Sequence, residues 1–145
     1  MFTVRVNGVP VGQPRPRACV RGGHAHIYNP PTADVGRQAV RLAVARSRLY
    51  MGREPVAVEL EFTMPRPKSH GGTGRNTGQL KASAPAFHKG KPDLDNMCKA
   101  VLDELQGDGQ LVQDDSQVVA LKATKRYGDI GETPGVTIRV STHDG

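Results

Sequence analysis

Four aspartates stand at the ends of two neighbouring segments of this chain, and carboxylates grouped in this way can support phosphate chemistry. Asp93 and Asp95 open a run with a regular apolar period, and Asp114 and Asp115 follow it after a short Gly-rich turn. Such a turn can bring three of the four carboxylates together. Carboxylates at one site repel one another unless a cation lies between them, and Mg2+ is typically held by one or two carboxylates plus waters and phosphate oxygens. The hypothesis is therefore a metal site for phosphate chemistry.

The first pair of acids is positioned by residues 94–105, which have the period of an amphipathic helix and contain neither Gly nor Pro. Asp93 or Asp95 is suited to cap its first turn, and Gly107 with Gly109 ends it. Lys99 lies four residues after Asp95, on a face turned away from the apolar stripe. That stripe consists of Leu94, Met97, Cys98, Val101, Leu102 and Leu105.

A purely structural interpretation of the same residues stays open. Asp before a helix is a common cap, and Asp-Asp-Ser-Gln before a strand is a common turn, so either half of the pattern alone is more often structural. Lys99 also has an ordinary alternative as the i,i+4 partner of Asp95 or Asp103 on a solvated face.

Three strings of the sequence resemble the RusA family of Holliday junction resolvases. They are Pro92-Asp93-Leu94-Asp95-Asn96 with Lys99, then Asp114-Asp115-Ser116-Gln117-Val118, and then Lys125-Arg126-Tyr127. Arg15-Pro16-Arg17 followed by His26-Ile27-Tyr28-Asn29-Pro30 is similar to phage-type relatives, which extends the resemblance over most of the chain. The resemblance implies that Asp93, Asp95 and Asp115 are the catalytic, metal-binding carboxylates. It also implies that Lys99 is catalytic and that Asp114 is an auxiliary acid.

The resemblance further implies a homodimeric endonuclease that depends on Mg2+, with Mn2+ as a possible substitute. Its substrate would be a four-way DNA junction, resolved by paired symmetric nicks during recombination and repair. Two other hypotheses stay open: a non-catalytic protein that binds branched DNA, and a metal-dependent nuclease acting on another branched or RNA substrate. No nucleotide cofactor is expected, because no strand leads straight into the Gly-rich run at 71–74 and no helix follows it.

The charge distribution favours a polyanionic partner. The formal net charge is +6, and residues 1–92 hold 15 of the 20 Lys and Arg with four acids, whereas residues 93–145 hold five bases and ten acids. A basic body around an acidic centre suits DNA gripped by its phosphates, although an acidic partner protein is also compatible. The predicted DNA contacts are Arg15, Arg17, Arg21, Lys68, Arg75, Lys89, Lys91, Lys125 and Arg126.

The predicted fold is a single α+β domain over residues 1–145, with two main helices packed on a mixed β-sheet. Strands are expected at 2–7, 56–64, 118–126 and 136–140, the last two forming a hairpin, and the first helix from Thr32 to about Tyr50. Residues 9–17 read as an extended arm because of their prolines. Residues 65–92 read as a long, mobile basic loop that orders in part on DNA.

Two cysteines and five histidines point to no further site. Cys19 and Cys98 are too few for a disulfide framework, which suits a reducing cytoplasm, and no segment has the length of a membrane span. His70, His88 and the pair His24 and His26 lack further ligands at zinc spacing. They are therefore expected to be surface residues.

Overall fold

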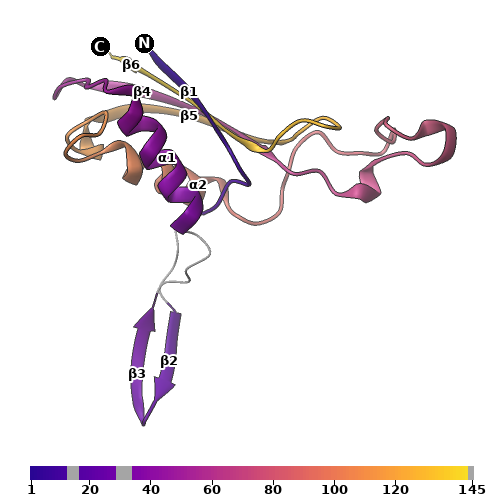
Figure 1. Cartoon of the computed structure of the whole chain (residues 1–145), viewed down its shortest axis with the longest axis horizontal. Helices are drawn as coiled ribbons and strands as arrows, with labels where there is room; N and C mark the ends of the chain where they lie inside the picture. Colours follow the sequence, from indigo (N-terminus) through magenta and orange to yellow (C-terminus); the bar gives the residue numbers. More distant parts are fainter. Residues whose placement is uncertain (13–16, 29–33, 144–145) are drawn as a thin grey trace.

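A four-stranded mixed sheet forms the body of the molecule (Figure 1). The computed structural model describes residues 1–12, 17–28 and 34–143. The strand order is β1 (Phe2–Asn7), β6 (Gly135–Thr142), β4 (Val56–Met64) and β5 (Val118–Tyr127). β6 pairs antiparallel with both β1 and β4, whereas β4 and β5 run parallel. The predicted mixed sheet is confirmed.

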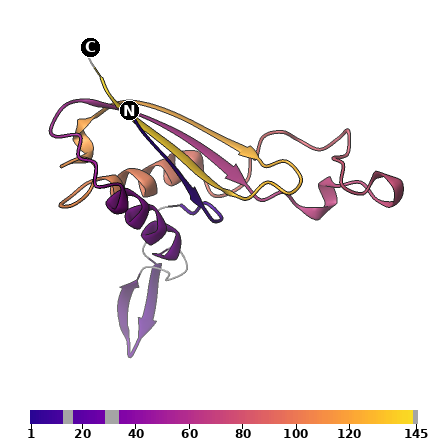
Figure 2. The same ribbon diagram turned by 45° about the horizontal axis from the view of Figure 1, so that its top comes forward.

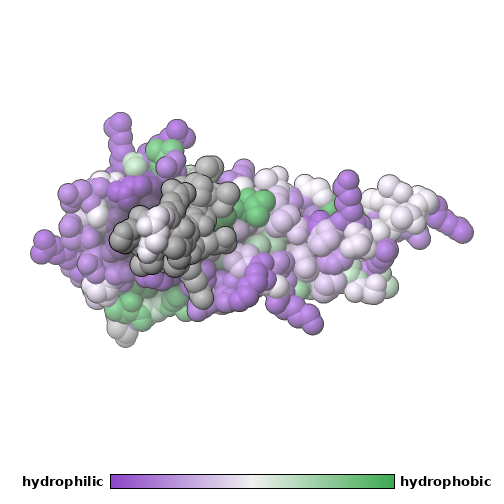
Figure 3. Space-filling model, turned by 90° about the horizontal axis from the view of Figure 1, so that it is seen from below, coloured by the Kyte–Doolittle hydropathy of each residue, from purple (hydrophilic) through white to green (hydrophobic). Residues whose placement is uncertain are grey.

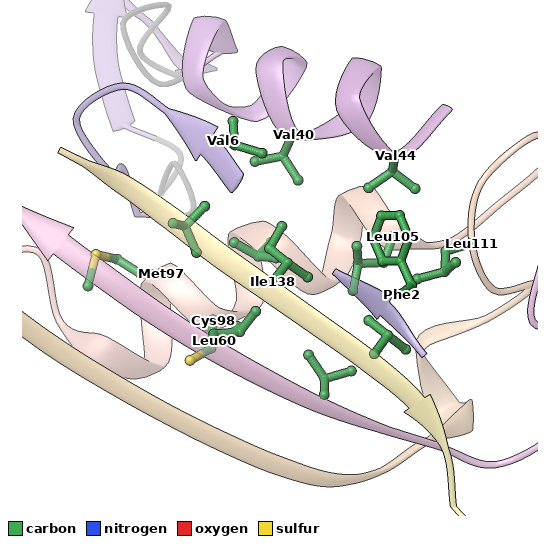
Figure 4. Packing of buried hydrophobic residues seen from close by; sticks show 14 of the residues in the cluster. Phe2, Val6, Val40, Val44, Leu60, Met97, Cys98, Leu105, Leu111 and Ile138 are labelled. Atoms are coloured by element: carbon green, nitrogen blue, oxygen red, sulfur yellow. The ribbon is translucent and has the colours of Figure 1, made fainter. Parts of the chain in front are cut away.

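Helices α1 (Asp34–Ser47) and α2 (Leu94–Leu105) pack against each other and against this sheet (Figure 2). The alternation of β4 explains the packing, because every second side chain from Val56 to Met64 is buried, whereas Glu59 and Glu61 are half-buried on the other face. Figure 4 shows the core between sheet and helices; its labelled members are Phe2, Val6, Val40, Val44, Leu60, Met97, Cys98, Leu105, Leu111 and Ile138. The predicted α+β class with two main helices is confirmed.

The expected hairpin of the last two strands is wrong. β4 lies between β5 and β6 and pairs with both of them. β4 has the longest uninterrupted alternation of apolar residues, so burial is greatest when it has a neighbour on each side. The chain therefore leaves β4, returns through α2 to form the parallel β5, and then passes β4 again to reach β6. A helical crossover of this kind is what a parallel pair requires.

A small hairpin, β2 (Arg17–Arg21) and β3 (His24–Tyr28), follows the predicted extended arm at 9–17 and was not among the predicted strands. Gly22 and Gly23 form its two-residue turn with φ of 58° and 80°, values that glycine adopts without strain. The Gly-Gly pair was the available sequence signal for this hairpin. The predicted helix start at Thr32 lies outside the described residues, and α1 ends at Ser47, three residues before the predicted Tyr50.

Residues 65–92, here called the basic extension, project beyond the end of the sheet at which β4 and β5 finish (Figures 1 and 2). They contain two 3-10 turns, η2 (Lys68–His70) and η3 (Gly74–Asn76), and a bridge between Gly71 and Leu80. The projecting part is mainly hydrophilic or neutral in Figure 3. The extension is thus a folded-back loop with local hydrogen bonds, and its mobility stays a prediction.

The base of the basic extension is attached to the ring of Tyr127 at the end of β5. The rings of His70 and His88 meet that ring edge-on at centroid distances of 4.9 and 5.1 Å, and the Arg66 guanidinium lies 5.0 Å from its centroid. Burial, and then the nearby Lys125 charge, lowers the pKa of His88. The two histidines were predicted as surface residues, but they pack against Tyr127 and help to fix the extension.

Within residues 1–12, 17–28 and 34–143, no helix is both long enough and apolar enough to cross a membrane.

Candidate active site

Asp93 is the N-cap residue of α2, but its side chain does not cap the helix. Its carboxylate accepts two hydrogen bonds from Lys91 Nζ, at 2.9 and 3.0 Å, while its backbone carbonyl accepts from the amide of Met97. Lys91 was predicted as a DNA contact. Because its side chain is 85% exposed, this ion pair is screened by solvent and its ammonium can exchange partners at little cost.

Lys125 fixes the backbone immediately before Asp93. Its ammonium donates to the carbonyls of Gly90 at 2.8 Å and Pro92 at 3.0 Å, so β5 holds the chain that leads into α2. This side chain was predicted to contact DNA. In the structure its ammonium binds backbone carbonyls just before the catalytic candidate Asp93. Lys125 therefore links the end of the sheet to the start of the helix.

Asp115 is the first residue of a 3-10 turn, η4 (Asp115–Gln117), just before β5, and Asp114 is the N-cap residue of that turn. Asp114 caps this turn: its Oδ1 accepts from Ser116 N at 2.8 Å, and Gln117 Oε1 accepts in return from Asp114 N at 3.0 Å. The hydrogen bonds from Ser116 lower the pKa of Asp114. Asp115 has an exposed side chain, and its amide donates to Gln106 Oε1 at 2.9 Å. The cap thus occupies Asp114 and leaves the Asp115 carboxylate at the surface.

An open groove of about 690 Å³ between α2 and β5 is lined by Asp95, Lys99 and Asp115, whereas the third predicted metal ligand, Asp93, is not among its lining residues. Its lining has an apolar part, here called the floor, and a charged part, here called the rim. The floor consists of Leu94, Cys98, Leu102, Leu121 and Ala123. Burial, and then the Asp95 charge, raises the pKa of the Cys98 thiol to about 11, so this sulfur stays protonated at neutral pH. The reactive surface of the groove is therefore its rim.

The rim holds a fourth charged residue, Asp103, which the sequence interpretation named only as a partner of Lys99. Its Oδ1 lies 3.9 Å from Lys99 Nζ, and both side chains line the groove. Asp95, Lys99 and Asp103 follow one another at steps of four, which places them in one row along the helix. That spacing was the signal for including Asp103 in the site.

The donor set of the groove fits a hard divalent cation. Asp95, Asp103 and Asp115 with Lys99 carry a formal charge of minus two, equal and opposite to that of one Mg2+, and all ligand candidates are carboxylate oxygens. Among residues 1–12, 17–28 and 34–143, however, no group of three or more His, Cys, Asp or Glu is arranged to hold a metal ion. The residues therefore fit a site with one or two carboxylate ligands, completed by water and a phosphate.

The remaining predicted DNA contacts fall into three groups. Arg15 lies outside the described residues, and Arg17 and Arg21 belong to β2, of whose side chains nothing is described. Lys68, Arg75 and Lys89 are exposed on the basic extension, and their contact with DNA stays a prediction.

Arg126 already has two carboxylate partners. Its guanidinium makes a bidentate pair with Glu132, at 2.9 and 2.8 Å, and a third bond to Glu61 Oε1 at 3.2 Å. The pair holds the pKa of Glu132 down at about 2. These bonds join β5 to the turn before β6. Since they compensate the charge of Arg126 within the protein, they do not favour the predicted DNA contact.

The sheet and the two helices form an α+β domain, and a groove lined by carboxylates lies on it. The chain matches the family model of the endodeoxyribonuclease RusA over residues 7–141. It is also 33% identical to the uncharacterized protein YqaN of Bacillus subtilis (strain 168) over 143 residues, which cover 93% of this chain and 92% of that protein. The chain therefore belongs to the RusA family of endodeoxyribonucleases, as the sequence motifs predicted.

Proposed function

We propose that this protein is an Mg2+-dependent endonuclease that resolves four-way DNA junctions by paired symmetric nicks. The observation that carries the proposal is the groove in which Asp95, Lys99 and Asp115 meet, in a chain of the RusA family. Asp95 and Asp115 line this groove from separate elements, α2 and η4, so its lining depends on the packed fold.

In this proposal Asp95 and Asp115 would hold the metal ion, and Asp93, the other acid of the family motif, would contribute a further carboxylate once Lys91 pairs with a DNA phosphate. When bound, Mg2+ supplies Lewis acidity to the phosphate and lowers the pKa of a bound water. Lys99 neutralises negative charge that develops on the phosphate or on the leaving oxygen. Asp103 keeps the Lys99 ammonium at the groove while the site is empty of DNA, and it yields when a phosphate enters.

A homodimer completes the proposal. A four-way junction with twofold symmetry presents two equivalent phosphates, and an isologous dimer presents two equivalent sites. One groove per subunit then accounts for paired nicks. The work of such an enzyme lies in recombination and repair of DNA, in the cytoplasm of its host cell.

The test is a cleavage assay with three labelled substrates: a four-way junction, a linear duplex and a single-stranded RNA, each with Mg2+, with Mn2+ or with EDTA. Symmetric nicks in the junction alone, abolished by EDTA, support the proposal. Binding without products in any metal identifies a non-catalytic DNA-binding protein, and products from the RNA or the duplex identify a nuclease of different substrate class. Analytical ultracentrifugation of the same preparation tests the dimer.

A further inference from the structure

Phe87 is a large apolar side chain held out into solvent. Of the three phenylalanines, Phe2 and Phe62 are buried in the core, whereas Phe87 is 68% exposed. The hydrophobic effect opposes such exposure. An aromatic ring displayed in this way on the basic extension needs an account other than the stability of the fold.

The backbone on both sides of Phe87 is fixed. The carbonyl of Ala86 accepts from the amide of Tyr127 at 3.0 Å, and the ring of His88 packs against the Tyr127 ring. Two residues further, Lys125 binds the carbonyl of Gly90. The ring is therefore presented from an anchored segment, so little conformational entropy is lost when it meets a partner.

A shallow pocket of about 250 Å³ lies beside the ring. Its apolar walls include Leu80, Pro85 and Tyr127, and the charged residues that line it are Arg66, Arg126 and Asp129. This open volume is several times the roughly 30 Å³ that a water molecule occupies in the liquid, which leaves room for one flat heterocycle. The carboxylate of Asp129 is unsuited to a phosphate but accepts hydrogen bonds from the N–H groups of a base.

The surroundings are suited to nucleic acid. Residues 65–92 contain six Lys and Arg and no acid, and Lys81 and Lys89 are exposed on either side of Phe87 in the sequence. Asp95, which lines the groove, follows Phe87 by eight positions, so the two lie at most about 29 Å apart. A DNA strand whose phosphate lies in the groove is thus within reach of the ring.

We infer that Phe87 and the pocket beside it receive an unstacked nucleobase from the branch point of the bound DNA. The inference rests on the proposed function, because it concerns how the proposed junction nuclease recognises its branched DNA substrate. The ring stacks on the base, and the exposed lysines of the extension hold the flanking phosphates. A continuous duplex offers no free base face, so this contact favours branched over linear DNA.

The experiment measures binding in EDTA, where no cleavage occurs, with four-way junctions that carry 2-aminopurine at the branch point. Wild type should change the fluorescence of this base, and F87Y should do the same because it keeps the ring. F87A and F87L should abolish the change and weaken junction binding roughly tenfold, within the range measured for a lost base–aromatic stack. Binding of a linear duplex should be unaffected. I130A is the matched control, since Ile130 is 46% exposed and lies outside the pocket.

Unchanged fluorescence and affinity in F87A overturn the inference, as does an equal loss for junction and duplex. A change of oligomeric state in F87A, measured by light scattering, overturns it in favour of a contact between copies of this chain. The two proposals fail separately. If wild type cuts junctions and F87A keeps the full fluorescence change, only the stacking role of Phe87 is refuted. If wild type gives the fluorescence change but does not cut junctions, only the proposed nuclease activity is refuted.

Discussion

At the scale of single residues, the proposal depends on the charged rim of the groove. D95N should abolish cleavage while junction binding is kept, because the variant loses a metal ligand and one negative charge that repels DNA. The expected loss of turnover is on the order of 1000-fold, given that the metal contributes several kcal/mol of charge stabilisation. The measurement is single-turnover cleavage beside a binding isotherm. D108N, which changes an exposed acid outside the groove, is the control. Normal turnover of D95N in Mg2+ would contradict the assignment.

Lys99 should matter for turnover and very little for stability. Its side chain is 64% exposed and its partner Asp103 lies at 3.9 Å, so the ion pair contributes only a few tenths of a kcal/mol. K99A should reduce turnover roughly 100-fold through the lost charge stabilisation, with an unchanged melting temperature. The exposed Lys122 on β5, outside the groove, gives the control K122A. A lower melting temperature with ordinary specific activity would identify Lys99 as structural.

The Arg126–Glu132 pair makes the stability of the fold dependent on pH. The folded-state pKa of Glu132 is about 2, below its ordinary value of 4.5, so its contribution is full above pH 4.5 and is lost as the pH falls toward 2. Both side chains are about 30% exposed, which limits the contribution to about 1 kcal/mol. E132Q should therefore be less stable than wild type at pH 7, with a difference that shrinks below pH 4.5. Urea denaturation at pH 7, 5, 4 and 3 measures it, and a constant difference speaks against the linkage.

At the scale of elements, strand pairing is most sensitive where glycine lets two strands approach. A Cβ on Gly135, the first residue of β6, would lie 2.5 Å from the carbonyl oxygen of Val6 in β1. G135A should therefore destabilise the protein by about 1–3 kcal/mol, the usual cost of overpacking. At Gly90 the nearest atom would be 3.5 Å away, so G90A should have little effect. Measuring the free energy of unfolding of both variants tests this prediction. Equal values would show that β1 and β6 can move apart to accommodate the added methyl group.

Helix packing connects the charged residues of the two helices. Glu104 of α2 is 7% exposed and forms ion pairs with Arg37 and Arg41 of α1, at 3.1 and 3.5 Å. Breaking a buried pair leaves an uncompensated charge, so these contacts hold the angle between the helices. The same packing presents the opposite face of α2, with Asp95 and Lys99, to the groove. The position of the site thus depends on elements that contribute no catalytic residue.

At the scale of the whole molecule, an acidic groove lies in a predominantly basic chain, and the basic extension projects from the end of the sheet (Figure 1). Junction binding should weaken steeply with salt, with a log–log slope of roughly −0.9 per phosphate neutralised. Replacing Lys68, Arg75, Lys81 and Lys89 by Gln should make the slope less steep by up to about 3.6 if each contacts one phosphate. Titrations between 50 and 200 mM salt check this, and an unchanged slope would exclude the extension from the DNA interface.

The sequence by itself determined the features that depend on local spacing. The period of 94–105 predicted α2, the alternation of 56–64 predicted β4 to the residue, and the motifs around Asp93 and Asp115 predicted the RusA family. Each of these is set by neighbours in the chain. For this reason they can be predicted without knowledge of the tertiary fold.

Only the tertiary structure decided which charges meet. It placed β4 between β5 and β6, gave Lys125 and Arg126 partners within the protein, turned Asp114 into a cap, and brought Asp103 into the groove with Asp95 and Asp115. These outcomes depend on contacts between residues distant in the chain, and a carboxylate or a guanidinium has several possible partners until packing selects one. The local motifs determine which chemical groups the site contains, whereas the packed fold determines how these groups are arranged.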